Sequence, residues 1–202
     1  MIACVTSLCG DDDEARGYEE GMSQDWNATN APTTDFDPGA EHRVLTGMVG
    51  AWEGLTRTWF DPSGAPEESR THASIEPLLG GRFVRIDYHS TAMGKPHAGQ
   101  FILGFDRTEE HYTAAWVDSF HMSANMMVST GAPRDDGRVS MLGSYTASMC
   151  DEQGVTQKQR WGWRTVIHQP DADTVVLESF NIWPEGREDR AVETRLTRRR
   201  QG

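Results

Sequence analysis

The chain has 202 residues, which suits one domain with a buried core and an additional tail. Its 19 Lys and Arg against 31 Asp and Glu give a net charge of −12, which argues against nucleic acid or an anionic membrane surface as the main partner. No apolar run reaches membrane-spanning length, and three cysteines without CxxC spacing indicate neither a disulfide framework nor a zinc site, so we expect a cytoplasmic protein.

The first 37 residues differ in composition from the rest of the chain. They hold nine acidic residues and one basic residue, which gives this segment a charge of −8, and they contain few aliphatic residues. Such a segment has too little apolar area to offset the entropy cost of ordering. We therefore predict a disordered acidic tail over residues 1–37 and one domain over residues 38–202. Met22 is a second candidate start of translation beside Met1.

A short helix is predicted at the start of the domain. Asp37 and Pro38 form an N-cap and first-position signal, and Val44, Leu45 and Met48 follow at helical spacing. The helix should end at Gly47 or Gly50. His42 falls on the polar side of this pattern, which indicates a surface histidine.

From Gly50 onward the sequence is typical of antiparallel strands. Trp52 stands between Gly50 and Gly54, where small residues let a strand bend and an indole can plug the end of a barrel. Turn signals rich in Asp, Gly and Pro recur at the spacing of an all-β meander. We predict an all-β, closed antiparallel lipocalin-like barrel of about ten strands with one short N-terminal helix. The strands are expected near residues 51–60, 67–78, 82–91, 97–105, 111–118, 122–130, 138–149, 155–168, 174–183 and 188–199.

Alternation along the strands separates two faces and suggests a cavity. Tyr112, Trp116 and Asp118 share one face of their strand, and Met122 and Met126 share a face of the next. If those faces look inward, they line an aromatic and methionine-rich interior with a few polar groups. Two further aromatic residues of the predicted ligand-binding set come from other strands, Tyr88 and Trp163.

Several short motifs together carry a resemblance to a known family. They are GAWEG at 50–54, DPSG at 61–64, LGGRF at 79–83, MGKP at 93–96, GFD at 104–106, WVDS at 116–119 and ETRLTR at 193–198. In this order they resemble an uncharacterised bacterial family of calycin-type barrels, across roughly residues 40–200. The resemblance implies a lipocalin-like closed barrel and supplies little mechanism. It also implies that Trp52 packs under an Arg of the last strand, and Arg198 matches that place.

Three classes of function remain open from the sequence. The first is binding of a small apolar or amphipathic molecule in the barrel cavity by Trp116, Met122, Met126, Tyr88 and Trp163. The second is a cofactor-free cyclase, isomerase or lyase in which Asp118 works with His121 or Tyr112, although Asp118 at a strand end equally suits a turn-capping role. The third is a haem barrel, which would need one histidine inside as an axial ligand, and the candidates are His89, His97, His111, His121 and His168.

Metal and partner expectations follow from the same residues. The seven histidines are spread out, and none shares a strand face closely with another, so we predict no metal site and no bound cofactor. The expected partner is a small apolar molecule, with no nucleic acid and no membrane, and a homodimer stays open.

Overall fold

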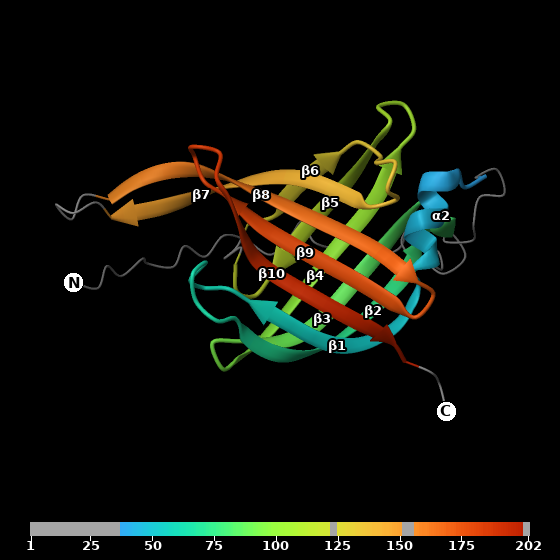
Figure 1. Ribbon diagram of the computed structural model, residues 1–202. Helices are drawn as coiled ribbons and strands as arrows, with labels where there is room; N and C mark the ends of the chain where they lie inside the picture. Colours follow the sequence, from blue (N-terminus) through green and yellow to red (C-terminus); the bar gives the residue numbers. More distant parts are fainter. Residues whose placement is uncertain (1–36, 122–124, 151–155, 200–202) are drawn as a thin grey trace, which may run out of the picture. The chain divides into compact units, whose positions relative to one another are not determined.

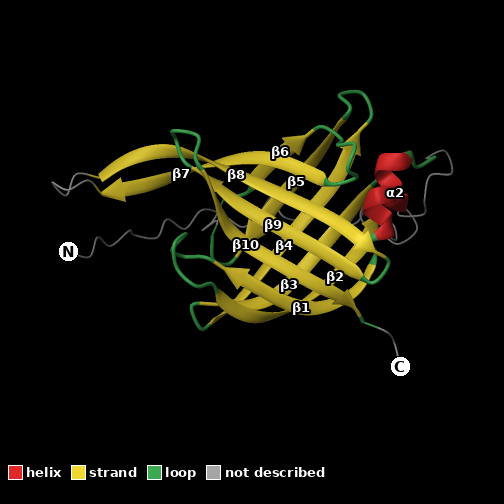
Figure 2. Ribbon diagram, viewed as in Figure 1, coloured by secondary structure: helices red, strands yellow, loops and turns green. Residues whose placement is uncertain are grey.

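The computed structural model describes residues 37–121, 125–150 and 156–199, with the side chains of Met149 and Cys150 excepted. Ten antiparallel strands close into a barrel in which each strand pairs with its sequence neighbours and β1 pairs with β10 (Figures 1 and 2). The strands are β1 Gly50–Thr58, β2 Glu67–Leu78, β3 Phe83–Ala92, β4 Lys95–Asp106, β5 His111–Asp118, β6 Met127–Gly131, β7 Val139–Cys150, β8 Thr156–Asp171, β9 Thr174–Ile182 and β10 Glu188–Arg198. Helix α2, Ala40–Gly47, precedes them, and a 3₁₀ turn, Leu79–Gly81, joins β2 to β3.

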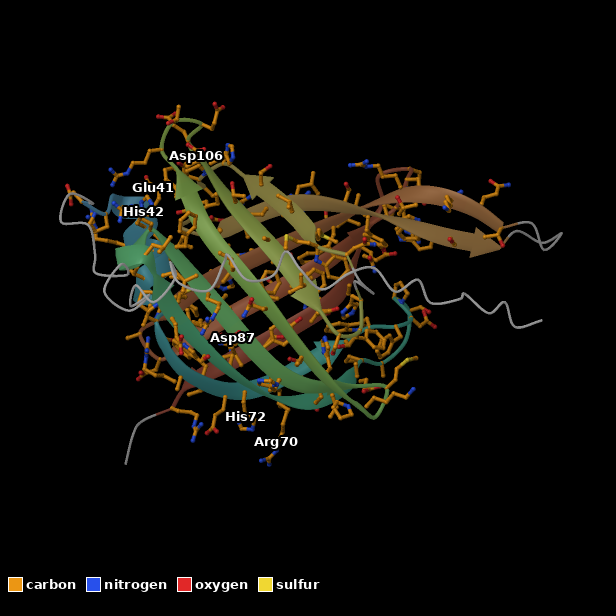
Figure 3. All side chains as sticks on the ribbon, turned by 180° about the vertical axis from the view of Figure 1, so that it is seen from behind. Glu41, His42, Arg70, His72, Asp87 and Asp106 are labelled. Carbon is orange, nitrogen blue, oxygen red and sulfur yellow. The ribbon has the colours of Figure 1, made fainter. Side chains whose placement is uncertain are left out.

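Strand alternation sets the inside and the outside of the barrel. In β2, Thr71 and Ala73 are buried, whereas Arg70 and His72 are exposed and project away from the barrel (Figure 3). This follows from the two-residue period of a strand, because inward residues meet the apolar core and outward ones meet water. The core consists of large buried side chains, among them Leu45, Met48, Ile75, Val84, Leu103, Met141 and Ile167.

The end of the barrel beside α2 is closed by a paired Trp and Arg. Trp52 is fully buried, and the Arg198 guanidinium lies 4.2 Å from the centre of its ring. The Trp52 indole donates to the Met48 carbonyl at 2.9 Å, and Arg198 donates to the Val49 carbonyl at 2.7 Å. Gly50 makes this approach possible, since a Cβ there would lie 2.3 Å from Arg198 Nη1. The Trp–Arg packing implied by the family resemblance is confirmed.

Helix α2 packs against β3 and β4 at this closed end. The helix begins two residues later than the sequence predicts, because Gly39 and not Asp37 occupies the N-cap position. No side chain caps this end. The prediction that His42 lies on the surface is wrong, since its residue is only 2 % exposed. Its ring packs edge-on against Phe105 at 5.9 Å, so a histidine on the polar side of the helical pattern still faces the barrel wall.

The predicted fold class is confirmed in strand number, strand direction and closure. The main difference is β6, which begins at Met127 and not near residue 122. The predicted tail over residues 1–37 lies almost wholly outside the described residues and stays a prediction. Among the described residues, no helix is long and apolar enough to cross a membrane.

Candidate ligand-binding site at the open end of the barrel

A cavity occupies the half of the barrel remote from α2. Its inner part has a volume of about 60 Å³ and lies among inward residues of β1 to β5 and β8 to β10. An outer chamber of about 200 Å³ adjoins it, and the two share Thr58, Trp116, His121 and Trp163 as walls. The outer chamber is completed by Trp59, Phe60, Phe120, Met127, Tyr145, Asn181 and Ala191. The cavity is therefore a small pocket behind a wider aromatic vestibule.

Stacked aromatic rings form one wall of this cavity. Phe101 of β4 lies parallel to Trp116 of β5 with centroids 5.4 Å apart, and Trp116 stacks on Trp163 of β8 at 5.5 Å. The Trp163 indole nitrogen is buried and has no hydrogen-bond partner among the described residues. Buried donors are normally paired, so this nitrogen is an unused donor beside the cavity.

Hydroxyl groups form the opposite wall. Thr56 of β1 bonds Thr71 of β2 at 2.6 Å and Thr194 of β10 at 2.8 Å. The chain of hydroxyls continues through Ser90 of β3 to Ser69 of β2, with Oγ–Oγ distances of 3.1 and 2.7 Å. Because the hydroxyls satisfy one another, they present mainly methyl and methylene groups to the cavity. The residues of this wall are polar, but the surface that they present to a ligand is mainly apolar.

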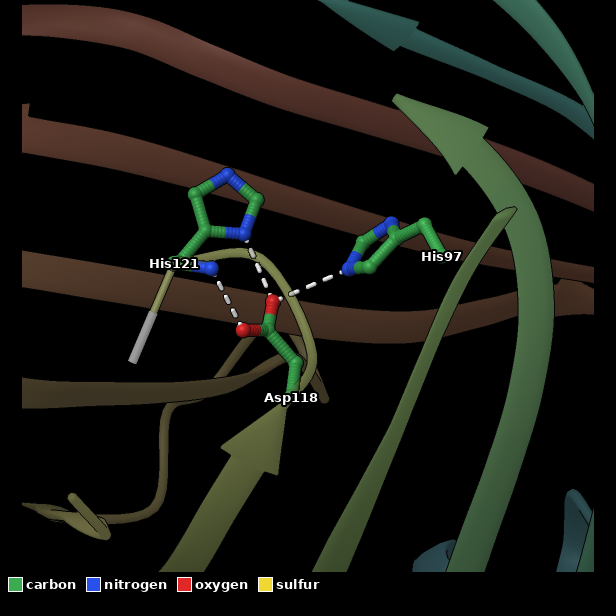
Figure 4. A group of neighbouring side chains, drawn as sticks. All are labelled: His97, Asp118 and His121. Atoms are coloured by element: carbon green, nitrogen blue, oxygen red, sulfur yellow. Dashed lines mark hydrogen bonds and ion pairs between the residues drawn. The ribbon is translucent and has the colours of Figure 1, made fainter. Parts of the chain in front are cut away.

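Three polar side chains meet at the junction of the two chambers. Asp118, the last residue of β5, has a fully buried side chain, and His97 of β4 and His121, after β5, both face its carboxylate (Figure 4). Asp118 Oδ2 lies 3.0 Å from His97 Nε2 and 2.6 Å from His121 Nδ1. Asp118 Oδ1 accepts the backbone N–H groups of Phe120 at 3.1 Å and His121 at 2.6 Å. One carboxylate thus orients two imidazoles and caps its own turn.

The Tyr88 hydroxyl, from β3, lies beside the carboxylate of Asp118. Its hydroxyl accepts from the Trp116 indole at 3.0 Å and lies 3.5 Å from Asp118 Oδ2. Burial, followed by the nearby Asp118 charge, raises the pKa of Tyr88, so the phenol stays neutral. Gly99 on β4 makes room for this packing, because a Cβ there would lie 2.2 Å from the Tyr88 hydroxyl and 2.8 Å from Asp118 Cβ.

The three ligand-type atoms of His97, Asp118 and His121 all lie within 4.8 Å of one another. Among the described residues this is the one group of His, Cys, Asp and Glu with such spacing. Imidazole nitrogen and carboxylate oxygen are both common metal donors, so the group can chemically hold an ion as well as share protons.

Comparison with known proteins places the chain in a family. The family model described as "Protein of unknown function (DUF1579)" matches residues 37–198. The chain belongs to this family. The family resemblance drawn from the short motifs is thereby confirmed, and among curated proteins no sequence matches the chain.

Three solved structures are similar to this DUF1579 chain to different degrees. The crystal structure of Rv2717c from M. tuberculosis has a TM-score of 0.51 at 16% identity and covers 81% of this chain and 100% of its own. An S-type phycobiliprotein lyase from Guillardia theta has a TM-score of 0.47 at 13% identity, covering 82% of this chain and 100% of its own. A de novo designed fluorescence-activating β-barrel has a TM-score of 0.40 at 13% identity, covering 77% and 97%. At these identities the similarity concerns the fold alone.

Several of the predicted site residues meet in the DUF1579 barrel. Asp118 and His121 are neighbours, and Trp116, Trp163 and Tyr88 all line the inner cavity. Tyr112 does not join them and is corrected: it shares a strand face with Asp118 but lies six residues away, about 20 Å along β5. There it packs against Phe105 at 5.1 Å, and burial raises its pKa to about 12.

One of the two predicted methionines, Met126, is also corrected. Met126 is 62% exposed, whereas Met127 is 3% exposed and lines the outer chamber. A shift of one residue turns every side chain of a strand to the other face, and the sequence pattern before β6 did not reveal that shift. Met122 lies outside the described residues.

Sequence reasoning named His97 among the histidines that could converge in the barrel but did not select it for the site. A signal for it exists, because His97 alternates with Phe101 and Leu103, whose apolar side chains face the core. The register of β4 on β5 then pairs Phe101 with Trp116 and Gly99 with Asp118, which brings His97 beside the turn after Asp118.

The haem hypothesis fits the cavity poorly. Pockets for drug-sized ligands span about 300–1,000 Å³, and a haem is larger than most of those ligands. The inner cavity of about 60 Å³ and the outer chamber of about 200 Å³ are both below that range, so their volumes argue against haem although His97 and His121 line the cavity.

Proposed function

We propose that this DUF1579 barrel binds a small amphipathic molecule at its open end. The observation that carries the proposal is the cavity itself: an apolar pocket and vestibule whose junction holds a buried carboxylate and two histidines. Ligand sites are typically apolar enclosures with a few convergent polar groups, and this end of the barrel has both features.

The two chamber volumes define how such a ligand would lie. A pocket of about 60 Å³ admits only a small group, so the bulk of the ligand belongs in the outer chamber of about 200 Å³. A flat ring there would meet Phe60, Phe120 and Tyr145. A polar end of the ligand would reach His97 or His121, which both line the inner pocket.

The test is a titration with an apolar fluorescent probe, anilinonaphthalene sulfonate, read by quenching of tryptophan emission. Thr58 lines both chambers, so Thr58→Phe should fill their junction and weaken probe binding by at least about tenfold. Thr130→Phe adds the same ring on the exposed outer face of β6 and should leave binding unchanged. Equal affinities for the two variants, or no binding by the wild type, would refute the proposal.

A second function, acid–base catalysis, is favoured by the shared carboxylate. If Asp118 accepts an N–H from each imidazole, then His97 Nδ1 and His121 Nε2 carry lone pairs, and neither nitrogen makes a hydrogen bond within the described part of the chain. A carboxylate that orients an imidazole in this way prepares it as a general base. The reaction class is proton transfer at a carbon acid, as in an isomerase or lyase.

Proton transfer can be measured before the natural substrate is known. A small molecule that native mass spectrometry finds co-purifying with the protein would be incubated with it in deuterated water. A catalyst should incorporate deuterium at a carbon atom of that molecule, and Asp118→Asn should slow incorporation by about a hundredfold or more. Binding without deuterium incorporation would leave the binding function and reject catalysis.

A further inference from the structure

We propose that His97, Asp118 and His121 form a binding site for one divalent transition-metal ion of the zinc type. This inference goes beyond ligand binding and does not depend on it, because ion binding and probe binding are read in separate experiments. It replaces the expectation from the sequence, which rested on histidines that are far apart along the chain.

The spacing of the donor atoms suits a single ion. Two donors that are each about 2.1 Å from a metal lie about 3.0–3.4 Å apart at octahedral or tetrahedral angles. His97 Nε2 lies 3.0 Å from Asp118 Oδ2, which already matches. His121 Nδ1 lies 2.6 Å from the same oxygen and within 4.8 Å of the His97 donor nitrogen, so it would have to move until both distances are about 3.0–3.4 Å. His121 follows β5 in an irregular segment, where such a shift disturbs no strand pairing.

The carboxylate is already held in the orientation that a metal ligand needs. Asp118 Oδ1 accepts two backbone N–H groups, so Oδ2 is the oxygen directed at the imidazoles. The Tyr88 hydroxyl, 3.5 Å from Oδ2, adds an outer contact, and the Trp116 indole in turn fixes that hydroxyl. Metal sites depend on such outer partners to orient their ligands. We infer that Asp118 would bind the ion through one oxygen.

An ion here would keep coordination positions open toward the cavity. The chain supplies three donors, while His97 and His121 also line the inner pocket and His121 lines the outer chamber. Three protein ligands with an open position are the pattern of catalytic zinc sites, whereas structural sites use four. Two histidines and one carboxylate are also the ligand set of non-haem iron(II) sites. The open positions would take an oxygen donor such as water, a hydroxyl or a carbonyl.

The experiment is metal binding by the full chain with Zn²⁺ and Co²⁺ alone. Calorimetry should detect one Zn²⁺ per chain, and the Co²⁺ spectrum should show nitrogen and oxygen ligation without thiolate bands, which excludes binding by the three cysteines. His97→Gln and His121→Gln should each weaken Zn²⁺ binding by about a hundredfold or more. His111→Gln, at the opposite end of β5, is the matched control and should bind as the wild type does.

Two outcomes would overturn the proposal. One is a folded wild-type protein that takes up neither ion at millimolar concentration. The other is Zn²⁺ binding that persists unchanged in the His97 and His121 variants, which would place the ion elsewhere. Tyr88→Phe removes no ligand and keeps the ring, so it should fold and weaken Zn²⁺ binding by about tenfold. Circular dichroism of each variant separates loss of the site from loss of the fold.

Discussion

Both ends of the barrel bury tryptophans beside polar groups, but one indole at the cavity end, that of Trp163, lacks the hydrogen bond that Trp52 and Trp116 make. At the α2 end, the Trp52 indole donates to the Met48 carbonyl, and Arg198 covers its ring while donating to backbone carbonyls. At the other end, the Trp163 indole has no partner among the described residues and lies beside a cavity. Paired polar groups stabilise a closed end, whereas unpaired groups beside a cavity retain the capacity to bind.

The largest expected effect is at the closed end. Trp52→Ala should lower the free energy of unfolding by about 3–5 kcal/mol, because it removes a fully buried indole. Arg198→Ala should cost less, and the two losses should not add, since the guanidinium lies over the ring. Denaturant unfolding of both single variants and the double variant measures the coupling. Strictly additive losses would show that the stacking contributes nothing.

The second effect tests the face of β6 at the open end. Met127→Ala should cost about 2–5 kcal/mol because its side chain is buried. Met126→Ala removes the same atoms from a residue that is 62% exposed and should change stability by less than about 0.5 kcal/mol. Chemical denaturation measures the stability loss of each variant. A larger loss for Met126→Ala than for Met127→Ala would mean that the opposite face of this segment is buried.

A smaller loss of stability is expected from a substitution at Gly99 of β4, which packs against Tyr88. Gly99→Ala places a Cβ against the Tyr88 hydroxyl and Asp118, which should cost about 1–3 kcal/mol through overpacking. It should also perturb probe binding at the open end. Gly64→Ala is the control, because its Cβ would meet only ordinary contacts at 3.4 Å in a turn. Equal stabilities of the two variants would contradict the close packing around Asp118.

The smallest effect is a pH dependence at the closed end. Burial, with help from Arg107, lowers the pKa of His42 below its ordinary value of 6.5. The unfolded chain therefore takes up a proton at a higher pH than the folded chain does, so this contribution to stability is complete above pH 6.5 and is lost as the pH falls below it. His42→Gln should flatten the fall of the thermal midpoint between about pH 7.5 and about pH 5.5. His72→Gln, at a side chain that is 60% exposed, should keep the wild-type dependence.

The sequence predicted the barrel well because its signals are local. Turn residues and two-residue alternation mark each strand, and Trp52 and Arg198 sit at the positions that close the barrel. Asp118 and Trp116 were found because they share one strand face. His97 was not selected because it belongs to another strand, and only the register of β4 on β5 brings it to Asp118. Tyr112 was misplaced because a shared face does not fix the position along the barrel.

The direct test of the contrast between the two ends is nitrogen–proton NMR of the seven indoles while anilinonaphthalene sulfonate is added. The Trp163 and Trp116 signals should shift with the probe, since both residues line the cavity, while the Trp52 signal should stay in place. A shift at Trp52 that equals those at Trp116 and Trp163, or no shift at the latter two under saturating probe, would contradict the contrast.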